Sequence, residues 1–170
     1  MQKLFLLILP LLTLPLSCVA AEKSAEETVA TLWNAISNDA GATADTATLQ
    51  RIFHQDAVIF GGRYQDGKPV VQRSMLDDFL KPLARVQEKG FYECEISRVV
   101  QTYDRFAVAY SVVESRTEKT ATKPDFVGVN SVQLYKQGDS WQILSLYYHV
   151  EKPDLPIAAP NAVSGRCLNH

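Results

Sequence analysis

The chain has 170 residues, with 17 basic and 19 acidic side chains and a formal net charge of −2 at neutral pH. This mild acidity, without any block of basic residues, argues against a nucleic-acid-binding protein. The length suits a single domain with its own hydrophobic core.

The first 21 residues have the pattern of a secretory signal peptide. Lys3 gives a positive start, the apolar run Leu4–Leu16 follows, and Val19-Ala20-Ala21 supplies small residues for cleavage. The run is shorter than the roughly 20 residues that a membrane span needs, and no later run is long enough. We therefore expect a periplasmic or secreted protein. One alternative stays open: Leu16-Ser17-Cys18 is similar to a bacterial lipoprotein box, in which Cys18 would carry a lipid anchor.

Two helices are expected at the start of the mature domain, which we place at residues 22–152. Ser24 is suited to cap a helix over Ala25–Ser37, whose apolar residues fall at helical spacing. Asp45 or Thr46 can cap a second, shorter helix that carries Leu49, Ile52 and Phe53.

A short strand and a third helix follow in the sequence. Branched and aromatic residues predict a strand over Ala57–Phe60, which Gly61-Gly62 would end. Asp66-Gly67 is a hairpin-type turn. The apolar spacing then predicts a helix over Val71–Gln87, with a kink or break at Pro82.

After Gly90 the apolar pattern changes to a period of two, which predicts four strands. We place these strands at Phe91–Thr102, Arg105–Thr117, Phe126–Lys136 and Trp141–Glu151. Their connections are too short for crossovers, so this meander must be antiparallel. Three helices can cover only one face, which predicts an α+β fold: a curved antiparallel sheet packed on three helices, with a cavity at its open end. We expect residues 153–170 to form an irregular tail over the surface.

Two cysteines, Cys94 and Cys167, remain after the signal peptide. In an exported protein they could form a disulfide that ties the tail to the sheet. Neither has a Cys or His neighbour at ligand spacing, so we expect no metal site. The sequence also lacks a glycine-rich phosphate loop, and we expect no cofactor.

Several short sequence motifs follow one another along the mature chain. They are Phe53-His54-Gln55-Asp56-Ala57, Phe91-Tyr92-Glu93, Glu114-Ser115-Arg116, Gly128-Val129-Asn130-Ser131-Val132-Gln133-Leu134 and Trp141-Gln142-Ile143-Leu144-Ser145-Leu146. With the order of elements, they resemble the nuclear transport factor 2-like (NTF2-like) superfamily, nearest its exported SnoaL-like branch. The resemblance implies a cone-shaped fold, a pocket inside the cone and homodimers packed through the sheet. It does not imply one activity, because the superfamily includes isomerases, cyclases, dehydratases and binding-only modules.

The resemblance also allows a test for ketosteroid isomerase chemistry, which needs a carboxylate base and acidic hydrogen-bond donors. The base would fall near Phe60 or Gly61, and neither can abstract a proton. The donors would fall near Trp33 and Asn130, whose N–H groups can still donate to a carbonyl oxygen. We therefore expect a pocket that can hold a carbonyl-bearing ligand without catalysing a reaction of that ligand.

The candidate ligand-pocket residues are Trp33, Phe60, Tyr64, Asn130 and Tyr148. For each, a structural role is the alternative: Trp33 in the core, Asn130 bonded to the backbone, Tyr64 in an exposed turn.

The candidate acid and base are His54 and Asp56, although a histidine that serves a helix dipole is commoner. We expect His149 to face a partner or solvent, opposite Tyr148. Four more charged residues on neighbouring strands should form cross-strand ion pairs or a polar patch inside the cone; they are Glu93, Glu95, Glu114 and Arg116.

These observations favour an exported domain that binds a small, largely apolar molecule. The first alternative is a lyase, isomerase or cyclase that acts on a small carbonyl-containing substrate. That activity would need His54, Asp56 or a glutamate of the sheet to point inward. The second alternative is a non-catalytic interaction module that works as a homodimer.

Overall fold

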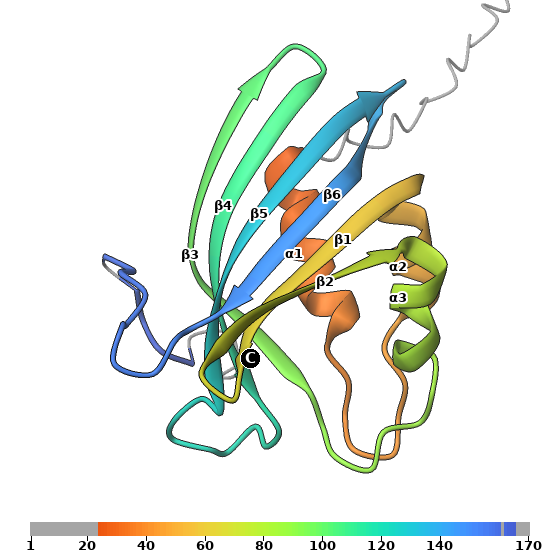
Figure 1. Cartoon of the computed structure of the whole chain (residues 1–170). Helices are drawn as coiled ribbons and strands as arrows, with labels where there is room; N and C mark the ends of the chain where they lie inside the picture. The colour runs from red at the N-terminus through yellow and green to blue at the C-terminus, as the bar shows by residue number, and fades with distance from the viewer. Residues whose placement is uncertain (1–23, 161, 166–170) are drawn as a thin grey trace, which may run out of the picture.

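The computed structural model describes residues 24–160 and 162–165 (Figure 1). The expected signal peptide, with Cys18, lies outside the described residues, and so does Cys167. Export, lipid anchoring and the Cys94–Cys167 disulfide therefore stay predictions.

The first two helices form where capping chemistry predicts them. Helix α1 spans Ala25–Ile36, and its cap Ser24 exchanges hydrogen bonds with Glu27: the Ser24 hydroxyl accepts from the Glu27 N–H at 3.1 Å, and the Glu27 carboxylate accepts from the Ser24 N–H at 2.7 Å. Helix α2 spans Thr46–Ile52, and its cap Asp45 accepts a 2.9 Å hydrogen bond from the Thr48 N–H.

The region between α2 and the meander differs from the prediction. Strand β1 spans Phe53–Gln65, much longer than the expected strand, and strand β2 occupies Lys68–Met75, where a helix was expected. Both residues of the Asp66-Gly67 turn have positive φ, so the chain reverses tightly and β2 pairs antiparallel with β1. This pairing overrides the helical spacing, and α3 is confined to Leu76–Leu83 with Pro82 near its end.

The meander was predicted to within one residue at each end. Its strands are β3 (Tyr92–Tyr103), β4 (Phe106–Arg116), β5 (Phe126–Gln137) and β6 (Ser140–Val150). The six-stranded sheet has the order β2-β1-β6-β5-β4-β3, antiparallel except for the parallel β1–β6 pair. The sheet curls around α1 and stays open, with the three helices on its inner face (Figure 1). The predicted α+β cone is confirmed.

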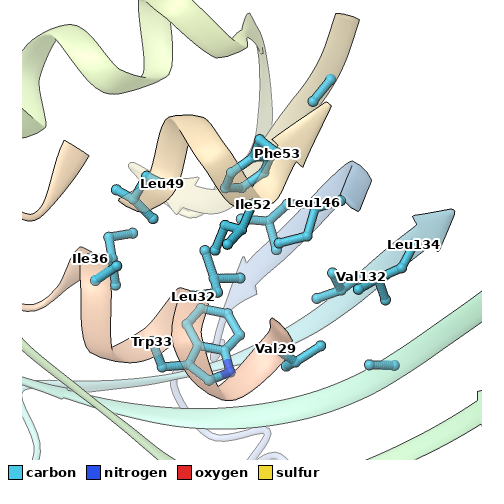
Figure 2. Packing of buried hydrophobic residues seen from close by; sticks show 14 of the residues in the cluster. Val29, Leu32, Trp33, Ile36, Leu49, Ile52, Phe53, Val132, Leu134 and Leu146 are labelled. Atoms are coloured by element: carbon cyan, nitrogen blue, oxygen red, sulfur yellow. The ribbon is translucent and has the colours of Figure 1, made fainter. Parts of the chain in front are cut away.

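The core lies between the helices and the inner face of the sheet. Val29 and Leu32 of α1, Leu49 of α2 and Leu146 of β6 are all at most 1% exposed. Burial of each such side chain contributes about 1.5–3 kcal/mol relative to exposure. Figure 2 shows these side chains in one cluster, with the Trp33 ring at its edge. The packed core therefore reaches the last turn of α1 and leaves space beyond it.

The C-terminal tail packs against the outer face of the sheet at one end. Ile157, Ala159 and Ala162 contact a second cluster formed by Cys94 and Val112 with Ile96. The tail thus covers the outer face of β3 and β4 near Cys94, although the partner predicted for that cysteine lies outside the described residues.

A buried ion pair anchors the end of the described tail. The Arg116 Nη2 atom lies 2.9 Å from the Glu114 carboxylate, which also accepts hydrogen bonds from the Ser164 hydroxyl and the Gly165 N–H. Burial favours the neutral form of Glu114, but these hydrogen bonds outweigh it and hold its pKa below the usual value. This pair lies within one strand and not across two, so it differs from the cross-strand pairing expected for it.

Candidate functional site

A cavity of about 390 Å³ lies between the last turn of α1, α3 and the inner face of the sheet. Its wall is mostly apolar. The apolar lining residues are Trp33, Ile36, Ile59, Phe79, Pro82, Leu83, Phe91, Val113, Phe126, Leu146 and Val150. The lining residues with polar side chains are Gln72, Ser74, Asp78, Glu93, Ser115, Asn130, Tyr148 and His149. The volume falls in the usual range for small-molecule sites.

The structure brings together three of the predicted pocket residues, Trp33, Asn130 and Tyr148. Tyr148 pairs with Asn130 on β5 and with Gly61 on β1, so the three positions form one row across the inner face. A Cβ atom at Gly61 would lie 2.4 Å from the Tyr148 hydroxyl oxygen. The glycine therefore leaves the room that the tyrosine ring occupies over β1.

Phe60 and Tyr64 do not line this cavity. Because side chains alternate along β1, the lining residues Ile59 and Gly61 place Phe60 on the outer face. The Tyr64 ring lies 5.7 Å from the ring of His149. His149 reaches the rim of the cavity, yet its ring also lies 6.3 Å from that of Tyr147, which is on the outer face.

The Trp33 indole N–H is used within the protein. It donates to the Glu95 carboxylate at 3.2 Å, and the Ser111 hydroxyl donates to the same oxygen at 2.6 Å. The other Glu95 oxygen lies 3.1 Å from Arg98 Nη2. Trp33 therefore offers its ring to the cavity, and not the hydrogen bond that the resemblance implied.

Asn130 is also tied to this network. Its side-chain amide donates a 3.3 Å hydrogen bond to the backbone carbonyl oxygen of Ser111. The hydrogen bond to the backbone, which was the structural alternative expected for this buried amide, is therefore present. The Asn130 side chain also forms part of the cavity wall.

Glu93 also lines the cavity, although the sequence pattern marked it only as one of four charged residues expected in cross-strand ion pairs or in a polar patch inside the cone. It faces Ser115 across β3 and β4, and its carboxylate accepts a 2.6 Å hydrogen bond from the Ser115 hydroxyl. Its backbone N–H donates to the Ser37 hydroxyl at 2.9 Å. Burial raises the pKa of the Glu93 carboxyl to about 7, although the Ser115 hydrogen bond acts in the opposite direction.

A signal for Glu93 existed in the sequence, because it directly follows two aromatic residues, Phe91 and Tyr92, and alternates with Glu95. The register that turns both glutamates inward depends on the irregularity between Glu95 and Ser97, where the pairing of β3 with β4 shifts. Apolar alternation alone could not reveal that shift.

His54 and Asp56 lie outside this cavity. The His54 Nδ1 atom is 3.7 Å from the Asp56 carboxylate, and the Asp56 side chain is 76% exposed. His54 lines a separate hollow with Gln50, Gln137 and Gln142. The pair is therefore not placed to act on a ligand in the cavity.

Two structural findings apply to the described part of the chain, residues 24–160 and 162–165. Within that part of the chain, no three His, Cys, Asp or Glu side chains gather in a way that could hold a metal ion. None of its helices has the length and apolar character needed to cross a membrane.

Comparisons with solved structures place this geometry among NTF2-like folds. An NTF2-like protein from Shewanella baltica has 17% identity and a TM-score of 0.53, over 75% of this chain and 90% of that chain. A protein with a cystatin-like fold from Nostoc punctiforme has 16% identity and a TM-score of 0.54, over 78% and 92%. An NTF2-like protein from Cytophaga hutchinsonii has 12% identity and a TM-score of 0.53, over 74% and 94%. No protein-family profile and no curated protein sequence matches this chain. The chain has the NTF2-like fold.

The raised pKa of Glu93 predicts a pH-dependent gain in stability for Glu93→Gln. Because the folded-state pKa of about 7 exceeds the ordinary value of 4.5, the protonated carboxyl stabilises the fold fully below about pH 4.5, and this contribution is lost as pH rises through about 7. Glutamine is neutral at every pH. The variant should therefore gain about 3 kcal/mol in the free energy of unfolding at pH 8 and less than about 1 kcal/mol at pH 5.

Urea unfolding at the two pH values measures this difference. Glu118→Gln, in the exposed loop after β4, is the matched control and should change little at either pH. An equal effect of Glu93→Gln at both pH values would show that the Glu93 carboxyl titrates normally.

Proposed function

We propose that this chain is an exported protein that binds a small, largely apolar molecule in the cavity on the inner face of the sheet. The observation that carries the proposal is the cavity itself: an apolar wall in which Glu93, Asn130 and Tyr148 provide the polar contacts. Small-molecule sites combine an apolar lining with a few convergent polar groups in this way.

Support for export comes from the sequence alone. The pattern of residues 1–21 favours a cleaved signal peptide and a SnoaL-like exported protein, with lipidation at Cys18 as the alternative. Intact mass measurement of the chain from its host tests this: an uncut N-terminus would contradict export.

The predicted ligand site can be filled by a substitution at Gly128. A Cβ atom there would meet only the His149 carbonyl oxygen, at 3.6 Å, which is an ordinary contact. Gly128 lines the cavity, so a leucine side chain at this position takes up volume that a ligand would need. We expect the wild type to bind the neutral apolar dye N-phenyl-1-naphthylamine, and Gly128→Leu to weaken that binding at least about tenfold.

Fluorescence titration of the dye provides the measurement. Gln133→Leu is the matched control, because Gln133 lies on the same strand with an exposed side chain on the outer face. Equal binding by the wild type and Gly128→Leu would place the dye elsewhere and overturn the cavity as the site.

A second function, proton transfer, is favoured by Glu93. A carboxyl group that titrates near neutral pH in a cavity can accept and return a proton. In this reaction the Glu93 carboxylate takes a proton from the carbon beside a ligand carbonyl, and the electron pair moves to the carbonyl oxygen as an enolate. Return of the proton to another carbon gives an isomer.

Exchange of α-protons in deuterium oxide tests this second function. With cyclohexenone as the probe, NMR should show exchange above the buffer rate for the wild type and loss of that excess in Glu93→Gln. Exchange at the buffer rate in both proteins would leave binding as the function of the cavity.

A second copy of this chain is the partner we propose for the outer face of the sheet. One row of paired residues crosses five strands: Val99, Tyr110, Ser131, Tyr147 and Phe60. These five are uncharged, although the row ends at Arg73 on β2, and Val99 and Tyr110 are 59% and 51% exposed. Two such rows can pack together without like-charge repulsion, as a two-fold dimer requires.

Val99→Lys should therefore convert a dimer into a monomer at micromolar concentration. The introduced ammonium group would be desolvated in the interface without a partner. Light scattering coupled to size exclusion gives the mass. Val86→Lys is the matched control, since Val86 is 68% exposed but lies beyond α3, away from the sheet. A monomeric wild type, or a Val99→Lys dimer, would contradict this interface.

A further inference from the structure

We infer that the ligand of the cavity is an organic ammonium cation, whose charged nitrogen lies against Glu93 and whose substituents contact the apolar and aromatic wall. This inference rests on the proposed binding function and names the chemical class of the ligand.

The charge of the wall is the first argument. The residues that line the cavity include two carboxylates, Glu93 and Asp78, and neither a lysine nor an arginine. Asp78 is exposed on α3, and its carboxylate lies 2.7 Å from the Lys81 ammonium group. Glu93 therefore supplies the unbalanced negative charge inside the cavity. A carboxylate or phosphate ligand would find no cation to bind among these residues.

Three glutamates on β3 and β4 differ in the partners of their carboxylates. Glu95 lies 3.1 Å from Arg98, and Glu114 lies 2.9 Å from Arg116. Glu93 is the exception, because its side chain has the Ser115 hydroxyl as a partner and no basic group among the described residues. An ionised carboxylate held away from water is costly without a compensating cation. A cationic ligand would supply that compensation.

The aromatic part of the wall is the third argument. Five rings line the cavity: Trp33 of α1, Phe79 of α3, Tyr148 of β6, Phe91 and Phe126. Aromatic rings attract organic cations, and this attraction strengthens where water is excluded. The rings also bury the apolar substituents of an ammonium group, which a hydrated metal ion lacks. The wall is therefore suited to an amine with apolar substituents.

The pH dependence of binding follows from the same geometry. A quaternary ammonium ion keeps its charge at every pH, so its affinity should rise between pH 6 and pH 8 as Glu93 ionises. The other titratable groups on the wall are Asp78 of α3, already paired with Lys81, and Tyr148 and His149 of β6. A neutral ligand should show no such rise.

The experiment compares ligands that share a benzyl group and differ in charge, by displacement of N-phenyl-1-naphthylamine from the mature chain. The probes are benzyltrimethylammonium, its neutral carbon isostere neopentylbenzene, and the anion phenylacetate. At pH 8 we expect the cation to bind at least about tenfold more tightly than the isostere, and phenylacetate more weakly than either. Glu93→Gln should bring the ratio of cation to isostere close to one, while Glu118→Gln should keep the wild-type ratio.

The outcomes separate this inference from the proposed function. If the wild type binds the neutral isostere as tightly as the cation, the cation inference is overturned and small-ligand binding stands. If Glu93→Gln keeps the preference for the cation, another group recognises the charge and the assignment to Glu93 is wrong. If neither the dye nor any probe binds, the proposed function fails together with the inference.

Discussion

The junction between the end of α1 and the start of β3 is the constraint on which the cavity depends. The Trp33 indole N–H donates to Glu95, the Ser37 hydroxyl accepts from the Glu93 N–H, and Asn38 and Phe91 exchange backbone hydrogen bonds at 2.8 and 2.9 Å. These contacts tie the end of the helix to the start of β3. They also hold Glu93 beside the last turn of the helix, where the packed core ends.

The glutamates of β3 and β4 fall into two groups, those with an arginine partner and the one without. Arg98 and Arg116 neutralise Glu95 and Glu114, which serve packing: the first holds Trp33, and the second anchors the tail. Glu93 has a hydroxyl and no cation, so burial disfavours its ionised form. A residue whose pKa is shifted by its surroundings in a cavity is a candidate for function, because folding alone does not require that residue to carry a charge. The geometry therefore assigns a structural role to Glu95 and Glu114 and a ligand-binding role to Glu93.

Much of the fold could be predicted from the sequence, because its signals are local. The cap at Ser24 and the period-two pattern after Gly90 fixed α1 and the meander closely. The helix expected from Val71 failed because β2 is held by its pairing with β1 through the Asp66-Gly67 turn, and this non-local contact outweighs helical spacing.

The candidate site could be predicted only in part, for a similar reason. Trp33 and Asn130 were found through the family resemblance and Tyr148 through strand alternation, whereas Phe60 and Tyr64 fell on the opposite face of β1. A single-residue error in strand register exchanges inner and outer faces, so isolated strands cannot settle orientation. To predict Glu93 as a cavity residue would have required both the register of β3 with β4 and the position of α1, and no local sequence pattern contains either.

Glu93 is a half-buried carboxyl group without a basic partner among the described residues, and a cationic ligand would neutralise it. Carbon-13 NMR of the labelled side-chain carboxyl, titrated between pH 4 and pH 9, tests this claim most directly. We expect a pKa of about 7 for Glu93 in the free protein and a fall in that pKa when benzyltrimethylammonium is added. A pKa near the ordinary 4.5, unchanged by the cation, would contradict it.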